Sequence, residues 1–160
     1  MAVSTAFKAT FIGSGSLLVA CVEMWRQAGN TLHGVVTLCP VATAWCDRNG
    51  IGHIAPSDDQ AAWLGRDTFD YLFSIVNHAI TPAEILNLPT RRAINFHDSL
   101  LPKYAGFNAT AWAIMSNEAQ HGVTWHAMTA DVDGGDILLQ QMIDILDDEV
   151  AFSLGAKCIE

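Results

Sequence analysis

Short apolar runs, each about as long as one β-strand, recur through the first hundred residues of this chain. They are almost continuously apolar and do not alternate with polar residues. That pattern is typical of parallel strands, because helices cover both faces of a parallel sheet and leave neither face to water. The runs predict four strands, at 9–12, 34–38, 71–76 and 93–96.

Helical patterns lie between these runs. The clearest follows the first strand, where apolar residues from Leu17 to Trp25 recur at steps of three and four, and Gly29 offers a stop signal. Weaker helical patterns lie at 61–64 and 82–86. The alternation of strands and helices predicts an α/β fold with an open, mostly parallel, Rossmann-like sheet and helices on both faces.

The pattern changes after Gly106. Segments 123–128 and 137–145 have the character of two strands on either side of a glycine-rich turn, and Asp147 is a candidate N-cap for a last helix. This helical pattern is still incomplete at Glu160, which predicts that the chain is truncated at its C-terminus. A length of 160 residues suits a single domain covering 1–160.

Charge and cysteine content exclude several classes of partner. Eight Lys and Arg against seventeen Asp and Glu give a net charge of −9, and a field of that sign repels phosphate backbones, so we expect no nucleic-acid partner. No apolar run is long enough for a membrane span. The four cysteines have mostly apolar neighbours and the first eight residues lack the pattern of a secretion signal, so we expect buried free thiols and a cytoplasmic location.

Common binding motifs are incomplete in this chain. Gly13-Ser14-Gly15 follows the first strand, but the third glycine of a dinucleotide fingerprint would fall at Leu18. The turn is better interpreted as a tight strand-to-helix connection whose backbone amides could hold a carboxylate or phosphate. The aspartates between 131 and 136 do not match a calcium loop, and the spacing of cysteines and histidines does not match zinc, so we expect no metal.

Asn95 and His97 lie two residues apart at the end of a predicted strand and therefore point to the same side. An asparagine amide donates hydrogen bonds, and a histidine can carry a proton near neutral pH. Asp133, in the glycine-rich turn, is the leading candidate for a carboxylate that orients the imidazole. Such a group suits acyl transfer through a tetrahedral intermediate. From spacing alone, the alternative that these side chains only satisfy loop carbonyls stays open.

Two longer motifs surround these residues. The segment 95–106, Asn-Phe-His-Asp-Ser-Leu-Leu-Pro-Lys-Tyr-Ala-Gly, resembles the Asn-x-His-x-Ser-Leu-Leu-Pro-x-x-x-Gly signature of the folate-dependent formyltransferases. Segments 121–126 and 131–138 are similar to the second motif of that family. Segments 107–113 and 121–126, with Asp98 next to His97, resemble most closely the formylation domain that opens some nonribosomal peptide synthetases. Many family members carry Pro or Gly in place of Asp98.

The resemblance implies formyl transfer from N10-formyltetrahydrofolate, as co-substrate, to an amine. It implies that Asn95, His97 and Asp133 are catalytic. Asn95 and His97 would stabilise the oxyanion, and Asp133 would hold His97 and help to remove the amine proton. Positions implied to contact or support the folate are Asn77, His78, Ala79, Ile80, Ser99, Leu100, Leu101, Pro102, Thr124 and His126.

The resemblance to synthetase domains implies that the acceptor is an aminoacyl group on a carrier protein. An acidic carrier protein would be repelled by the net charge unless Arg91, Arg92 and Lys103 steer it. Two alternatives remain. One is a hydrolase that releases formate from the same folate, and the other is a non-catalytic, truncated module of the same fold.

Overall fold

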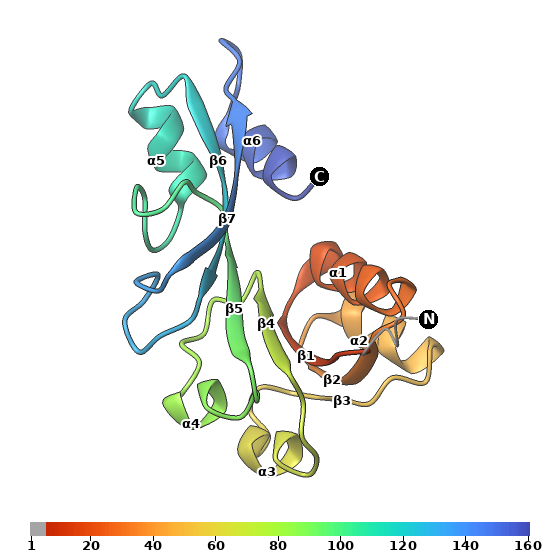
Figure 1. Ribbon diagram of the computed structural model, residues 1–160. Helices are drawn as coiled ribbons and strands as arrows, with labels where there is room; N and C mark the ends of the chain where they lie inside the picture. The colour runs from red at the N-terminus through yellow and green to blue at the C-terminus, as the bar shows by residue number, and fades with distance from the viewer. Residues whose placement is uncertain (1–5) are drawn as a thin grey trace, which may run out of the picture. The chain divides into compact units, whose positions relative to one another are not determined.

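The computed structural model describes residues 6–160; residues 1–5, part of the segment judged to lack a secretion signal, lie outside the described residues. The described chain divides into two compact units, one ending at Ile94 and the other beginning at Asn95 (Figure 1). The single domain 1–160 stays a prediction. Each unit is taken by itself below.

The first unit is a parallel α/β unit with the strand order β3-β2-β1-β4. β1 is central, and its four middle residues are buried, as expected for a strand flanked on both sides and covered on both faces. Strand β5 (Arg92–His97) begins in this unit and ends in the second. The other elements are β1 (Lys8–Gly13), α1 (Gly15–Gln27), β2 (Thr31–Val36), α2 (Pro40–Arg48), β3 (His53–Ile54), α3 (Gln60–Leu64), β4 (Tyr71–Ile75) and α4 (Ala83–Leu86).

Helices cover both faces of this parallel sheet. On one face Trp25 of α1 meets Phe11 of β1, with ring centroids 6.2 Å apart. Phe11 pairs with Val35, so the neighbouring Gly34 faces the opposite side. There Trp63 of α3 packs so closely that a Cβ on Gly34 would lie 2.2 Å from its ring. The expected α/β fold, with an open, mostly parallel sheet and helices on both faces, is confirmed.

Some elements of the first unit differ from the prediction. β2 begins at Thr31, three residues before the expected start, and ends at Val36, two residues before the expected end. α2 and β3 were not predicted at all. α2 has only one aliphatic residue larger than alanine, Val41, and that residue is exposed, so no apolar stripe stands out in the sequence; β3 is only two residues long.

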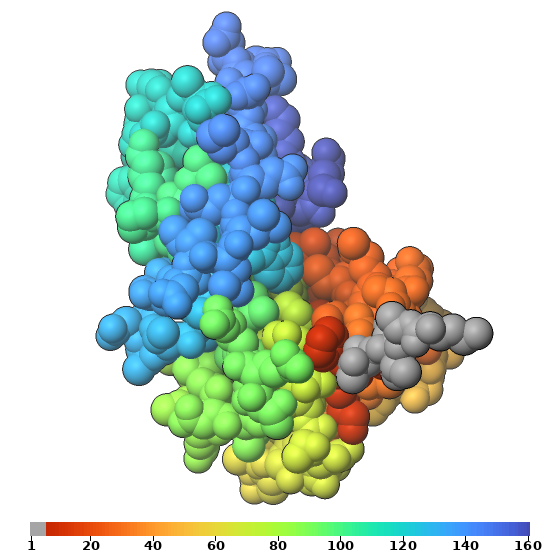
Figure 2. Space-filling model, viewed as in Figure 1, coloured from red at the N-terminus to blue at the C-terminus, as the bar shows by residue number. Residues whose placement is uncertain are grey.

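The second unit is built on an antiparallel pair, β6 (Gln120–Ala127) and β7 (Ile137–Asp144). β6 is largely buried. β7, blue in Figure 2, lies at the surface along most of its length. Helices α5 (Ala109–Met115) and α6 (Ala151–Cys158) pack against each other.

Both helices of this unit differ from the sequence-based expectation. α5 was not predicted. The N-cap of α6 is Val150, not Asp147, because Glu149 is turned inward and its carboxylate binds Ser153 and Lys157 of the helix. Among the residues that the structure describes, no helix combines the length and the apolar character needed to cross a membrane.

Candidate active site

The end of β5, the end of β6 and the loop between β6 and β7 bring four polar side chains together in the second unit. Asp133 lies between two imidazoles: its Oδ2 is 3.7 Å from Nδ1 of His97, and its Oδ1 is 3.5 Å from Nε2 of His126. Asn95 Nδ2 donates to the same nitrogen of His126, at 3.1 Å. The three sequence-predicted catalytic residues therefore lie in one group, and His126 joins them.

Asp133 is held firmly in this position. Its backbone is left-handed, with φ 53°, a conformation that Asp tolerates better than most residues. The backbone N–H of Gly106 donates to Oδ2 at 2.8 Å. The carboxylate is 9% exposed and the two imidazoles are 8% and 3% exposed, so the group is almost withdrawn from water. Interactions between charges are stronger in such surroundings than at the surface.

Backbone carbonyls determine which nitrogen of each imidazole carries a proton. Nε2 of His97 donates to the carbonyl oxygen of Tyr104 at 2.9 Å, and Nδ1 of His126 donates to that of Ala127 at 2.9 Å. A carbonyl oxygen can only accept, so both of these nitrogens are N–H groups. The other nitrogen of each ring is the one that faces Asp133.

The loop after β5 is fixed by Thr124, which is fully buried. Thr124 Oγ1 donates to the carbonyl of Ser99 at 2.6 Å and accepts from the N–H of Leu101 at 3.1 Å. Gln140 of β7, which the sequence did not single out, adds bonds to Thr124 Oγ1 and the Leu101 carbonyl, both at 2.9 Å. Ser99 and Leu101 are buried, Leu100 is half-buried and Pro102 is exposed, so contact of all four with a folate stays a prediction.

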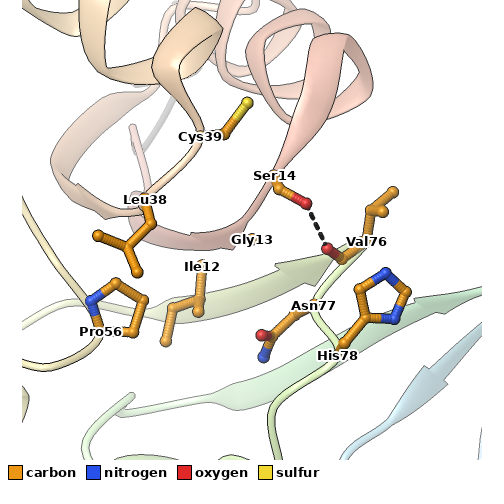
Figure 3. A pocket seen from close by; sticks show the side chains of 9 residues that line it. All are labelled: Ile12, Gly13, Ser14, Leu38, Cys39, Pro56, Val76, Asn77 and His78. Carbon is orange, nitrogen blue, oxygen red and sulfur yellow. Dashed lines mark hydrogen bonds between the residues drawn. The ribbon is translucent and has the colours of Figure 1, made fainter.

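The first unit has a cavity of about 270 Å³ at the carboxyl ends of its strands (Figure 3). The chain adds β2 and β3 on one side of β1 and then crosses to β4 on the other side, and such a switch point is where open α/β sheets bind ligands. Ser14 donates to the carbonyl of Val76 across it, at 2.8 Å. The lining residues are Ile12, Gly13, Ser14, Leu38, Cys39, Pro56, Val76, Asn77 and His78.

Two of the four predicted folate residues of this unit, Asn77 and His78, line that cavity, whereas Ala79 and Ile80 are not among its lining residues. The side chain of Asn77 is occupied in the turn that follows β4: its Oδ1 accepts from the N–H of Ala79, and its Nδ2 donates to the carbonyl of the same residue at 3.1 Å. Ile80 is 79% exposed. Their contact with a folate stays a prediction.

The four cysteines do not share one environment. All are free thiols, but Cys21 and Cys39 are only half-buried, so the expectation that every cysteine is buried is wrong. Cys39 lies at the start of α2, beside the cavity (Figure 3). The backbone N–H groups of Ala42 and Gly15, in the first turns of two helices, lower the pKa of this thiol.

Cys39 is expected to be the first cysteine that iodoacetamide alkylates at pH 8, at least about tenfold faster than Cys21. Burial raises the pKa of Cys21 to about 11 and that of Cys158 to about 12, and it also raises the pKa of Cys46. Peptide mapping by mass spectrometry measures the order of labelling. Cys39→Ser should remove the fast phase and Cys21→Ser should keep it; prior labelling of Cys46 or Cys158 would contradict the prediction.

Comparison with known proteins adds independent evidence. The formyl transferase family model matches residues 70–160. GDP-perosamine N-formyltransferase from Brucella melitensis biotype 1 is 38% identical over 85 residues, which are 53% of this chain and 33% of that protein. The matched stretch thus spans about a third of the length of the curated relatives.

Solved structures share the fold. Phosphoribosylglycinamide formyltransferase from Anaplasma phagocytophilum superposes with a TM-score of 0.85 at 22% identity, over 97% of this chain and 80% of that one. A formyltetrahydrofolate deformylase from Pseudomonas syringae pv. tomato gives a TM-score of 0.86 at 16% identity, over 98% and 57%. With the family model matching more than half of its length, this chain belongs to the formyl transferase family.

Proposed function

We propose that this chain binds N10-formyltetrahydrofolate and transfers its formyl group to an amine. The observation that carries the proposal is the almost buried carboxylate of Asp133, which two imidazoles face, one of them bonded to the amide of Asn95. Donor, proton carrier and carboxylate are the groups that acyl transfer requires, and their position in a formyl transferase family member supports this chemistry.

In the proposed reaction the amine attacks the formyl carbon, and the carbonyl oxygen becomes an oxyanion. Asn95 Nδ2 donates one N–H to His126 and keeps its second N–H for that oxyanion. When the tetrahedral intermediate collapses, the bond from carbon to N10 of the folate breaks. The Asp133 carboxylate, which Nδ1 of His97 faces, takes the proton lost by the amine and returns it to N10, so that tetrahydrofolate leaves neutral at that nitrogen.

The geometry changes the part proposed for His97. Its Nε2–H donates to the Tyr104 carbonyl and its Nδ1 faces Asp133, so both nitrogens have partners within the protein. Direct donation to the oxyanion would require His97 to give up one of these partners. We therefore propose that His97 acts with Asp133 in moving the proton, and that Asn95 is the direct oxyanion donor.

The nature of the amine is a separate proposal. We keep an aminoacyl group on a carrier protein as the acceptor, because the motifs around His97 and Trp112 resemble the formylation domains of peptide synthetases. Two of the basic side chains expected to steer a carrier are already ion-paired: Arg91 Nε lies 3.5 Å from Asp70, and Lys103 Nζ lies 2.5 Å from Glu118. The steering charge is therefore smaller than the sequence implies.

Isothermal titration with a stable N10-formyltetrahydrofolate analogue tests the donor site, and we expect saturable one-to-one binding. Turnover is then followed as tetrahydrofolate release with a glycyl-loaded carrier protein and, separately, with a nucleotide-linked amino sugar. Release that requires the carrier supports the proposed acceptor, and release that requires the sugar replaces it. Formate release without any amine would favour the hydrolase, and a folded chain that binds no analogue would contradict the function.

A further inference from the structure

The reaction proposed above gives functions to Asn95, His97 and Asp133. It gives none to His126, the fourth side chain of the candidate site. It is 2% exposed, and its side chain touches both Asn95 and Asp133. The inference that follows rests on the proposed formyl transfer, because it concerns the amide that would bind the oxyanion. It starts from the two nitrogens of the His126 ring.

The hydrogen bonds of His126 determine its tautomer. Nδ1 donates to the carbonyl of Ala127, so in the neutral ring Nε2 has a lone pair and can only accept. The amide of Asn95 meets this lone pair with Nδ2, its donor end, at 3.1 Å. A protonated His126 would instead present an N–H, and the amide of Asn95 would have to turn its Oδ1 toward the ring. The charge of His126 therefore decides the orientation of Asn95.

We propose that neutral His126 is a positioning residue that holds the Asn95 amide with its donor end in place, which leaves the second N–H of Nδ2 free for the formyl oxygen. Protonation of His126 reverses the amide and removes that donor. Asn95 is the residue that touches the substrate, and His126 acts through it. The hydrogen bond from Nδ1–H of His126 to the Ala127 carbonyl keeps the proton of the neutral ring on Nδ1, so that Nε2 stays an acceptor.

The two imidazoles then have different functions, although they face one carboxylate. The titratable groups that face His126 in the second unit are Asp133, from the loop after β6, and His97, from β5, whose ring centroid lies 6.5 Å away. Asp133 Oδ2, which also accepts from Gly106, faces His97. A proton on Nδ1 of His97 would point at the carboxylate and leave the His126–Asn95 bond intact, whereas a proton on Nε2 of His126 would break that bond.

Long-range ¹H–¹⁵N spectra of the imidazoles test the tautomer in the unmodified protein, without any substrate. We expect the protonated nitrogen of neutral His126 to be Nδ1, and the side-chain amide signals of Asn95 to shift as His126 is protonated at lower pH. A proton on Nε2 of neutral His126, or an Asn95 amide that does not respond, would overturn the proposal. This readout is independent of turnover, so it separates a failure here from a failure of the proposed function.

Kinetics of three variants test the consequence. His126→Leu should lower kcat by about 10- to 100-fold with little change in KM, because the amide is retained but is free to turn. His126→Gln places a carbonyl oxygen near the position of Nε2, and should restore most of kcat. In a chain that also carries Asn95→Ala, His126→Leu should cost nothing further.

A purely structural role makes the opposite predictions. His126→Gln would then fail to restore kcat, and His126→Leu would lower kcat by the same factor whether or not Asn95 is present. Either result overturns the proposal. Thermal melts of each variant, and titration with the folate analogue, show whether a loss of kcat comes from unfolding or from loss of the donor site.

Discussion

Asn95→Ala is expected to lower kcat for formyl transfer by about 10²- to 10³-fold, the usual effect of removing one oxyanion donor. KM for the folate should change little, because the lost hydrogen bond strengthens only as charge develops on the formyl oxygen. Steady-state release of tetrahydrofolate measures both constants. The expected loss is larger than that for His126→Leu, since the donor itself is gone.

Asn87 offers a matched control for this substitution. It lies at the C-terminal end of α4 and is exposed, and Asn87→Ala makes the same chemical change away from the candidate site. We expect its kcat to equal that of the unmodified protein. Unchanged turnover in Asn95→Ala, with a normal thermal melt, would show that Asn95 contributes no donor to the reaction.

Asp133→Asn is expected to lower kcat by about 10²- to 10⁴-fold, the range for loss of a general acid or base. The substitution keeps the shape of the side chain but removes the negative charge that faces both imidazoles. An amide cannot take the amine proton, and it no longer stabilises a protonated His97.

Asp136→Asn is the control, since Asp136 lies in the same loop and is exposed, and its backbone carbonyl, which accepts from Ala127, is unaffected. It should keep full activity. If Asp133→Asn and Asp136→Asn behave alike, the carboxylate of Asp133 has no part in proton transfer, and the proposed mechanism is wrong. Titration with the folate analogue shows whether either variant has lost the donor site instead.

Local sequence pattern was sufficient where a strand is buried on both faces or a helix has a long apolar stripe. β1 and β4 are evident in the sequence because strands inside a parallel sheet bury both faces. α1 is evident because its apolar residues recur at helical spacing over several turns. α2 and β3 were not evident, because a helix with a single, exposed aliphatic residue larger than alanine and a strand of two residues leave no periodic signal. Their existence depends on packing against the rest of the sheet.

The sequence by itself determined the class of fold, the family and the three residues expected to do chemistry. Alternation along one strand places Asn95 and His97 on one side, and the motif marks Asp133. The tertiary structure alone decided which partners these residues bond to, because tautomers and amide orientations depend on groups distant in the chain. Nε2 of His97 donates to the Tyr104 carbonyl, Nδ1 of His126 donates to the Ala127 carbonyl, and Nε2 of His126 meets the amide of Asn95, 31 residues away in the chain.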